Sequence, residues 1–157
     1  INNKVKIKKI IEEVVVLISK RIKKKKISLK VDLDEDQKFV IGDPEKLSIL
    51  FLNLIDNAIK FSNPLKTIEI KILKVDEIFK KFISISIIDE GIGINEEDIH
   101  RITERFFRAE NTRKLKIEGT GLGLAIVKHI INQHGGELKI ISKVGLGSEF
   151  IVRLPKA

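Results

Sequence analysis

The sequence predicts an α+β fold: a two-layer α/β sandwich in which helices cover one face of a mixed, mostly antiparallel sheet. Two observations predict this class. Segments with the alternating apolar pattern of strands come in pairs, and amphipathic helical segments separate the pairs. The resulting order is helix, two strands, helix, two strands, loop, helix, two strands, which differs from the strict strand–helix alternation of a parallel sheet. A chain of 157 residues is the size of one such domain.

The N-terminal segment, residues 1–26, is expected to form the helix and linker side of this single domain, and residues 27–157 are expected to form its main body. Residues 5–22 repeat apolar side chains with the helical period, and the helix should continue through the basic run at 19–26. Because the chain begins with Ile1 and contains no Met, we expect it to be a piece of a longer protein.

The first part of the main body should contain two strands and a long helix. Residues 27–33 and 38–42 have the strand pattern. Asp43 and Pro44 predict a helix start, because Asp accepts hydrogen bonds from the first free N–H groups and Pro suits the first helical position. The helix should reach about Phe61 and stop at the sequence SNP that follows.

The second part of the main body should contain four strands and two helices. Residues 67–73 and 81–89 alternate and are expected to pair with each other. The other expected elements are a short helix at 95–102 with Asn95 as its cap, a loop at 105–118, a helix at about 121–134 that ends where Gly135 takes the left-handed conformation, and a hairpin of strands at 137–142 and 149–154.

The net charge of +8 and the pI near 9.6 are typical of nucleic-acid-binding proteins. However, most Lys residues are dispersed, the one dense basic run lies at 19–26, and the chain has no Tyr or Trp on which bases could stack. We therefore expect no nucleic-acid partner. No apolar run approaches the roughly 18 residues of a transmembrane helix, so no membrane contact by this domain is expected. The absence of Cys excludes disulfides and fits a cytoplasmic location, whether or not the parent protein is anchored in a membrane.

A polar stripe runs along the helix that begins at Pro44. Asn53, Asp56, Asn57 and Lys60 are spaced by three, four and seven residues, so they share one face of that helix. Two amides, a carboxylate and an ammonium group on one face are a candidate binding surface rather than an ordinary mixture of Lys and Glu.

Three glycine clusters follow in the second half of the chain: DEGIGI at 89–94, GTGLGLA at 119–125 and GLGS at 145–148. The second cluster opens a helix, where free N–H groups and the helix dipole favour anions, so phosphates are expected near 119–124. It is neither a Walker loop nor a dinucleotide-binding GxGxxG motif. Each cluster alone also fits an ordinary turn, and only the combination with the polar stripe indicates a site.

The order of NLIDNAIKFS, DEGIGI, ERFFR, GTGLGLA and GLGSEF resembles the catalytic ATP-binding domain of sensor histidine kinases, in the superfamily that includes the gyrase, Hsp90 and MutL ATPases. The resemblance extends over about residues 5–155 and implies the Bergerat ATP-binding fold. It further implies a protein histidine kinase that binds Mg²⁺ and ATP. Its γ-phosphoryl group would go to a histidine on a separate dimerisation and phosphoacceptor domain, and a response-regulator receiver domain would be a further partner in two-component signalling.

The resemblance assigns roles to the polar stripe and to the first glycine cluster. Asn57 matches the Asn whose side-chain oxygen binds Mg²⁺, an ion that prefers oxygen ligands. Asn53 matches a second Asn of the same motif, Lys60 a Lys that reaches the phosphates, and Phe61 the aromatic residue beside the adenine. Asp89 matches the acid that accepts a hydrogen bond from the exocyclic amine of adenine, where guanine has a carbonyl group.

Residues 101–118 match the ATP lid, in which Arg108 matches an Arg that contacts the γ-phosphate and Arg105 is a weaker candidate. Thr103 departs from the family, which often has Phe there. The implied catalytic residues are Asn57, Lys60 and Arg108, and Asn57 is also the implied metal ligand. The implied nucleotide-binding residues are Asn53, Asn57, Lys60, Phe61, Asp89, Gly91, Gly93, Ile94, Arg108, Gly119, Thr120, Gly121, Leu122, Gly123, Leu124 and Ser148.

The residue type at position 53 favours one chemistry among those of the superfamily. Its ATPases and serine kinases have a Glu there as general base, whereas the Asn53 amide cannot take a proton near neutral pH. A neutral imidazole is already nucleophilic, so transfer to histidine needs less activation. An autonomous ATPase and a non-catalytic nucleotide-binding module remain the alternatives. The chain's own histidines, His100, His129 and His134, lack a His-Asp/Glu helix signature, so the acceptor is expected on another domain.

Overall fold

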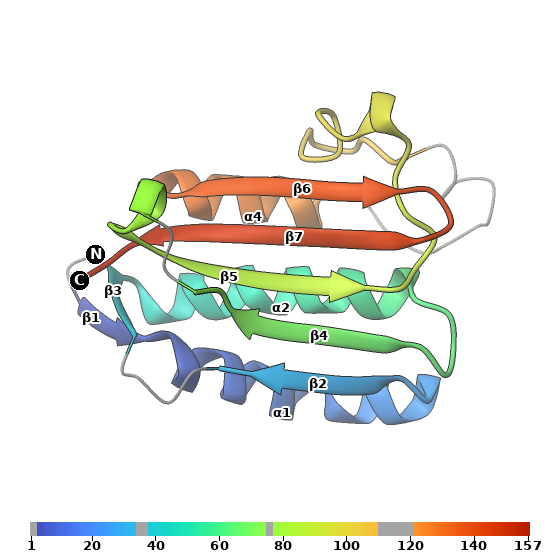
Figure 1. The fold of residues 1–157 in the computed structure, drawn as a ribbon, viewed down its shortest axis with the longest axis horizontal. Helices are drawn as coiled ribbons and strands as arrows, with labels where there is room; N and C mark the ends of the chain where they lie inside the picture. Colours follow the sequence, from blue (N-terminus) through green and yellow to red (C-terminus); the bar gives the residue numbers. More distant parts are fainter. Residues whose placement is uncertain (1–2, 34–37, 75–76, 110–120) are drawn as a thin grey trace.

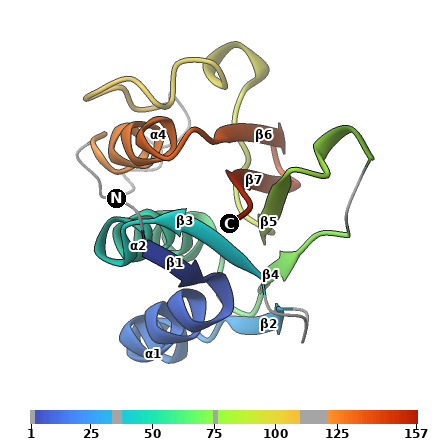
Figure 2. The same ribbon diagram turned by 90° about the vertical axis from the view of Figure 1, so that its left-hand side faces the viewer.

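The computed structural model describes residues 3–33, 38–74, 77–109 and 121–157 and has the expected two-layer architecture. A five-stranded sheet lies on one side, and the helices α1, α2 and α4 cover one of its faces (Figures 1 and 2). The elements are β1 (Asn3–Lys6), α1 (Ile7–Lys25), β2 (Ser28–Asp32), β3 (Phe39–Gly42), α2 (Pro44–Phe61), β4 (Thr67–Ile72), η1 (Glu77–Phe79), β5 (Phe82–Asp89), η2 (Glu96–Asp98), α4 (Gly123–Gln133), β6 (Glu137–Lys143) and β7 (Gly147–Pro155).

The sheet is mixed, with strand order β2-β4-β5-β7-β6. Only β2 and β4 run parallel, because the chain passes through α2 between them, and the other neighbours are antiparallel. The pairing of β4 with β5 and the β6–β7 hairpin confirm two predictions from the alternating patterns. Between the layers, the buried apolar residues of the three helices and of the sheet form one core.

The first strand of the chain was not expected. The apolar pattern predicts a helix that includes Val5, but Val5 lies in β1, which ends at Lys6, and α1 begins at Ile7. A spacing of two suits a strand as well as a helix, and here buried Val5 pairs with buried Val40 of β3. As a result, β3 belongs to a separate two-stranded sheet and not to the main sheet.

Two expected helices differ from the sequence prediction. At 95–102 the chain forms only the 3₁₀ helix η2 followed by turns, and the Asn95 side chain makes no cap hydrogen bond. Only Ile102 of this segment is buried, which is too little apolar packing to hold a longer helix. The last helix begins at Gly123 rather than 121, whereas its end is as predicted, with Gly135 at a φ of +66°. The predicted loop at 105–118 is irregular over 105–109, and its remainder lies outside the described residues.

The start of α2 has the predicted cap. The Asp43 carboxylate accepts hydrogen bonds from the N–H groups of Glu45 and Lys46, at 3.0 and 3.4 Å, and Pro44 is the first helical residue. The apolar face of α2 is buried between its neighbours, so the opposite, polar stripe is directed away from the core. None of the helices in the described part of the chain combines the length and apolar composition needed to cross a membrane.

His134 joins the end of α4 to the start of α2. Its buried ring accepts a hydrogen bond at Nε2 from the Asp43 N–H, at 3.1 Å, and Nδ1 lies 2.8 Å from the Ile130 carbonyl oxygen. An Nε2 that accepts from a backbone N–H requires the proton on Nδ1, which then donates to Ile130. Gly42 is necessary beside the ring, because a Cβ there would lie 2.6 Å from His134 Cδ2. The residue therefore has a structural role.

Replacing His134 with Ala should lower the free energy of unfolding by about 1–3 kcal/mol, because the Asp43 N–H would lose its acceptor inside the protein. Urea denaturation at neutral pH measures this change. The matched control is His129→Ala, on the exposed side of the same helix, which should change stability by less than about 0.5 kcal/mol. Equal effects of the two substitutions would show that the bridge does not stabilise the fold.

Candidate functional site

A cavity of about 180 Å³ lies where α2, the start of α4, residues 92–94 after β5, the first part of β7 and the 101–109 segment meet. Most of the residues implied by the sequence line it: Asn53, Asn57, Lys60, Phe61, Gly93, Ile94, Arg108, Gly121, Gly123, Leu124 and Ser148. Asp89, Gly91 and Leu122 do not line it, although each is next in sequence or in strand pairing to a residue that does. Gly119 and Thr120 lie outside the described residues.

All four residues of the polar stripe line the cavity, so they share one face of α2 as their helical spacing predicted. Asn53 donates a hydrogen bond from Nδ2 to the Ile49 carbonyl oxygen at 2.8 Å, which leaves its Oδ1 as an acceptor. This oxygen faces Gly123, where an added Cβ would lie only 3.2 Å from it. The absence of a side chain at Gly123 therefore leaves space beside the Asn53 amide oxygen at the start of α4.

Asp89 is a buried acid at the end of β5, with only 5% of its surface exposed. Burial raises the pKa of Asp89 to about 6, against the lowering effect of backbone hydrogen bonds with Gly91 and Ser148. The Gly91 N–H donates to Asp89 Oδ1 at 2.9 Å and fixes the carboxyl group. Ser148, its partner in the β5–β7 ladder, lines the cavity, so the acid stands directly beside that wall.

Gly91 and Gly93 allow the chain after β5 to lie close to its neighbours. A Cβ on Gly91 would lie 2.4 Å from the Phe61 carbonyl oxygen, and the next N–H, of Ile92, donates to that same oxygen at 3.2 Å. Gly93 has a φ of +72°, and a Cβ there would lie 2.2 Å from the Lys143 carbonyl oxygen. The first contacts pack the chain after β5 against the C-terminal end of α2, and the last packs Gly93, which lines the cavity, against the end of β6.

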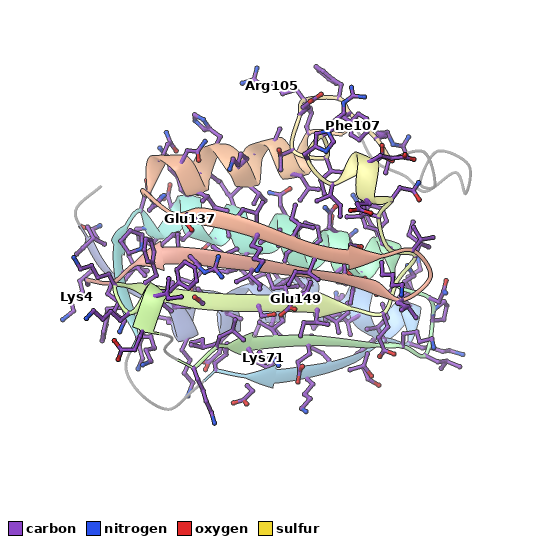
Figure 3. All side chains as sticks on the ribbon, turned by 45° about the horizontal axis from the view of Figure 1, so that its top comes forward. Lys4, Lys71, Arg105, Phe107, Glu137 and Glu149 are labelled. Carbon is purple, nitrogen blue, oxygen red and sulfur yellow. The ribbon has the colours of Figure 1, made fainter. Side chains whose placement is uncertain are left out.

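The described part of the expected lid, residues 101–109, closes one side of the cavity. The Phe106 N–H donates to the Gly121 carbonyl oxygen at 3.0 Å, so the two ends of the described chain on this side meet. The Arg101 guanidinium lies 4.4 Å from the centre of the Phe107 ring, and Phe107 lines the cavity together with Arg108. Arg105 does not line it, and Figure 3 shows its side chain at the outer end of the segment, farther from the sheet than Phe107.

Several lining residues were not among those that the sequence indicated: Asp56, Ile92, Ile102, Phe107, Ala109 and Phe150. Asp56 had a signal, because it belongs to the polar stripe, and so did Ile92 and Phe107, which lie within the motifs DEGIGI and ERFFR. For residues such as Ala109 and Phe150 the residue type was no guide, since an apolar side chain in a sequence is more often part of a core than of a binding surface. In the part of the chain that the structure describes, no group of three or more acidic or His residues is placed to hold a metal.

Comparison with known proteins gives consistent matches. Residues 42–157 match the family described as "Histidine kinase-, DNA gyrase B-, and HSP90-like ATPase". The sequence is 38% identical over 156 residues to the sensor protein KdpD of Clostridium acetobutylicum, which covers 96% of this chain and 17% of KdpD. It is 42% identical over 118 residues to the sensor histidine kinase YkoH of Bacillus subtilis, which covers 75% of this chain and 25% of YkoH. The chain thus spans a quarter or less of these two relatives.

The mycobacterial sensor histidine kinase MprB superposes with a TM-score of 0.85 at 29% identity, over 99% of this chain and 98% of that structure. The family match covers well over half of the chain, and the structural match extends over nearly all of it. The fold, the cavity beside α2 and the three glycine clusters therefore have one explanation: the chain belongs to the histidine kinase-, DNA gyrase B- and HSP90-like ATPase family, as the catalytic ATP-binding domain of a sensor histidine kinase.

Proposed function

We propose that this domain binds Mg·ATP in the cavity beside α2 and transfers the γ-phosphoryl group to a histidine on a separate dimerisation and phosphoacceptor domain. The observation that carries the proposal is the convergence of Asn57, Lys60 and Arg108 on one cavity from α2 and the 101–109 segment. The structure of full-length ShkA was determined in complex with AMPPNP, a triphosphate analogue. It superposes on this chain with a TM-score of 0.82 at 26% identity.

The donor set of the cavity fits a nucleotide that carries Mg²⁺. Asn57 offers a neutral amide oxygen, and Mg²⁺ commonly completes its shell with substrate phosphates and water. When bound, the ion would neutralise phosphate charge. Lys60 and Arg108 bring two cationic groups to the same cavity. At the other end, Asp89 can accept a hydrogen bond from the adenine amine, with Phe61, Gly93, Ile94 and Ser148 around the base.

The acids near the cavity favour transfer to histidine over hydrolysis. Asp56 is the one carboxylate among the described lining residues, and both of its oxygens are engaged by cations, from Arg21 and Lys60. Asn53 cannot remove a proton from water. A neutral imidazole nitrogen on the partner can bond to the γ-phosphorus while the bond to the bridging oxygen breaks and ADP leaves, and this step depends on positioning and charge stabilisation.

We propose further that the parent protein acts in two-component signalling, with a response-regulator receiver domain as the next partner, and that this domain works in the cytoplasm without contacting nucleic acid or membrane. One structural neighbour, the histidine kinase ThkA, was determined in complex with the response regulator protein TrrA, and it superposes on this chain with a TM-score of 0.80 at 26% identity. We also assign residues 1–26 to the linker side and residues 27–157 to the ATP-binding body, although α1 contributes to the common core.

The decisive experiment mixes the domain with the phosphoacceptor domain of the parent protein and ATP labelled at the γ-phosphate. Label that appears on the acceptor, stable to base and lost in acid, is the expected result, and it should be absent when the acceptor histidine is replaced by Gln. Release of inorganic phosphate alone would instead establish an ATPase. Tight ATP binding with neither product would establish a nucleotide-binding module.

A further inference from the structure

Asp56 connects α1 to the cavity through two ion pairs. Its Oδ1 pairs with the Arg21 guanidinium of α1, and its Oδ2 lies 3.3 Å from the Lys60 ammonium. The Asp56 side chain is 20% exposed, that of Lys60 32% and that of Arg21 51%. One carboxylate in the cavity wall is thus shared by a cation inside the cavity and a cation outside it.

This arrangement matters because Asp56 is a negative charge in the wall that, in the proposed function, faces phosphates. Without Arg21, the Asp56 carboxylate would repel the triphosphate, and it would attract the Lys60 ammonium more strongly because no other cation would share its charge. When Lys60 turns to a phosphate, the Arg21 pair leaves Asp56 still compensated. Arg21 can do this from outside, since it does not line the cavity itself.

The position of α1 does not depend on Arg21. Lys25, one turn further on, donates from Nζ to the carbonyl oxygens of Ile59 and Lys60, at 2.6 and 2.9 Å, and holds the last turn of α2. Ile18 and Ile22 of α1 are buried in the core. Loss of the Arg21 side chain should therefore change the charge beside Asp56 and leave the two helices packed.

We propose that Arg21 is a positioning residue of the nucleotide site: by neutralising Asp56 from outside the cavity, it keeps Lys60 available for the phosphates of the bound nucleotide. This inference rests on the proposed function of Lys60. It makes the C-terminal part of α1 an electrostatic part of the site, although α1 contributes no residue to the cavity lining.

The test measures the affinities of Mg·ATP and of adenosine for the wild type and for Arg21→Gln, Asp56→Asn and the double variant. Arg21→Gln should weaken Mg·ATP about fivefold, a typical size for a partly exposed ion pair, and should leave adenosine, which has no phosphate, unchanged. Asp56→Asn should bind Mg·ATP at least as tightly as the wild type. The double variant should regain the affinity lost in Arg21→Gln, because no carboxylate remains to be compensated.

Two controls separate this role from others. Lys20→Gln removes one positive charge from the exposed neighbouring position of α1 and should have no effect on either ligand, whereas Arg21→Lys should retain most of the wild-type affinity. A wild type that fails to bind Mg·ATP would refute the proposed function. A wild type that binds, with equal losses for Mg·ATP and adenosine in Arg21→Gln or no recovery in the double variant, would overturn this inference alone.

Discussion

Replacing Asp89 with Asn should weaken ATP binding by about a hundredfold or more and at the same time stabilise the folded protein at pH 7. The two effects have opposite signs because the ionised carboxylate of Asp89 increases the affinity for ATP but lowers the free energy of unfolding. As a buried acceptor beside the cavity, it is proposed to recognise the adenine amine, and a buried polar group left badly paired costs affinity by orders of magnitude. The Asn amide can present its NH₂ group to the base, which then meets another donor.

The gain in stability follows from the raised pKa of Asp89. The difference between about 6 in the folded chain and the ordinary 3.8 corresponds to about 3 kcal/mol, at about 1.4 kcal/mol per pH unit. For an acid whose folded pKa is raised, the stabilising contribution is complete below about pH 3.8 and is lost as the pH rises through about 6. The variant has no such loss, and its Oδ1 can still accept from the Gly91 N–H.

Urea denaturation of both proteins between pH 4 and pH 7, with calorimetry of ATP binding, measures both effects. The advantage of Asp89→Asn should be near zero at about pH 4 and should reach its full value, up to about 3 kcal/mol, at about pH 7. GTP is the ligand control, because the wild type should reject it and the variant should discriminate less. If the free energies of unfolding of the wild type and Asp89→Asn change with pH in the same way, the pKa of Asp89 is not raised. If the wild type binds ATP and GTP equally well, Asp89 does not recognise the adenine amine.

Replacing Asn57 with Ala should remove the dependence of ATP binding on Mg²⁺ while the fold survives. The amide oxygen of Asn57 is the proposed protein ligand of the ion, so the affinity measured with Mg²⁺ should fall to the level measured with EDTA. A loss of about 10–100-fold is expected, the range typical of groups that support a bound metal. Ala is a good helix former and Asn57 lies on the polar face of α2, so the free energy of unfolding should change by less than about 1 kcal/mol.

The matched control is Asn132→Ala, an exposed amide on α4, which should leave both the affinity and its dependence on Mg²⁺ unchanged. Binding of nucleotide is measured by calorimetry with Mg²⁺ and with EDTA, and folding by circular dichroism. If the Asn57 variant keeps the wild-type difference between the two conditions, the metal is held elsewhere and the assignment of Asn57 is wrong.

Most of the site on α2 could be predicted from the sequence, because a helix converts spacing directly into geometry. Asp43 and Pro44 marked its first turn, and Asn53, Asn57 and Lys60 then had to share a face opposite the apolar residues. The paired strands β4 and β5 could also be predicted from the sequence, since alternation of apolar and polar residues over several positions indicates a strand.

The structure of short segments, and the pairing of residues far apart in the chain, could not be predicted from the sequence. Val5, two residues before Ile7, fits either a strand or the start of the helix, and only its pairing with Val40 selects the strand, while Ile7 begins α1. The segment at 95–102 had cap and acidic residues typical of a helix start, but a cap cannot hold a helix without apolar packing.

The family, the polar stripe on α2 and the glycine clusters could be identified from residue types and from their spacing within one element. The burial of Asp89, which raises its pKa to about 6, and the ion pair between Arg21 of α1 and Asp56 of α2 became visible only in the folded chain. Burial and charge pairing are properties of side chains that lie far apart in the chain, and packing alone brings them together.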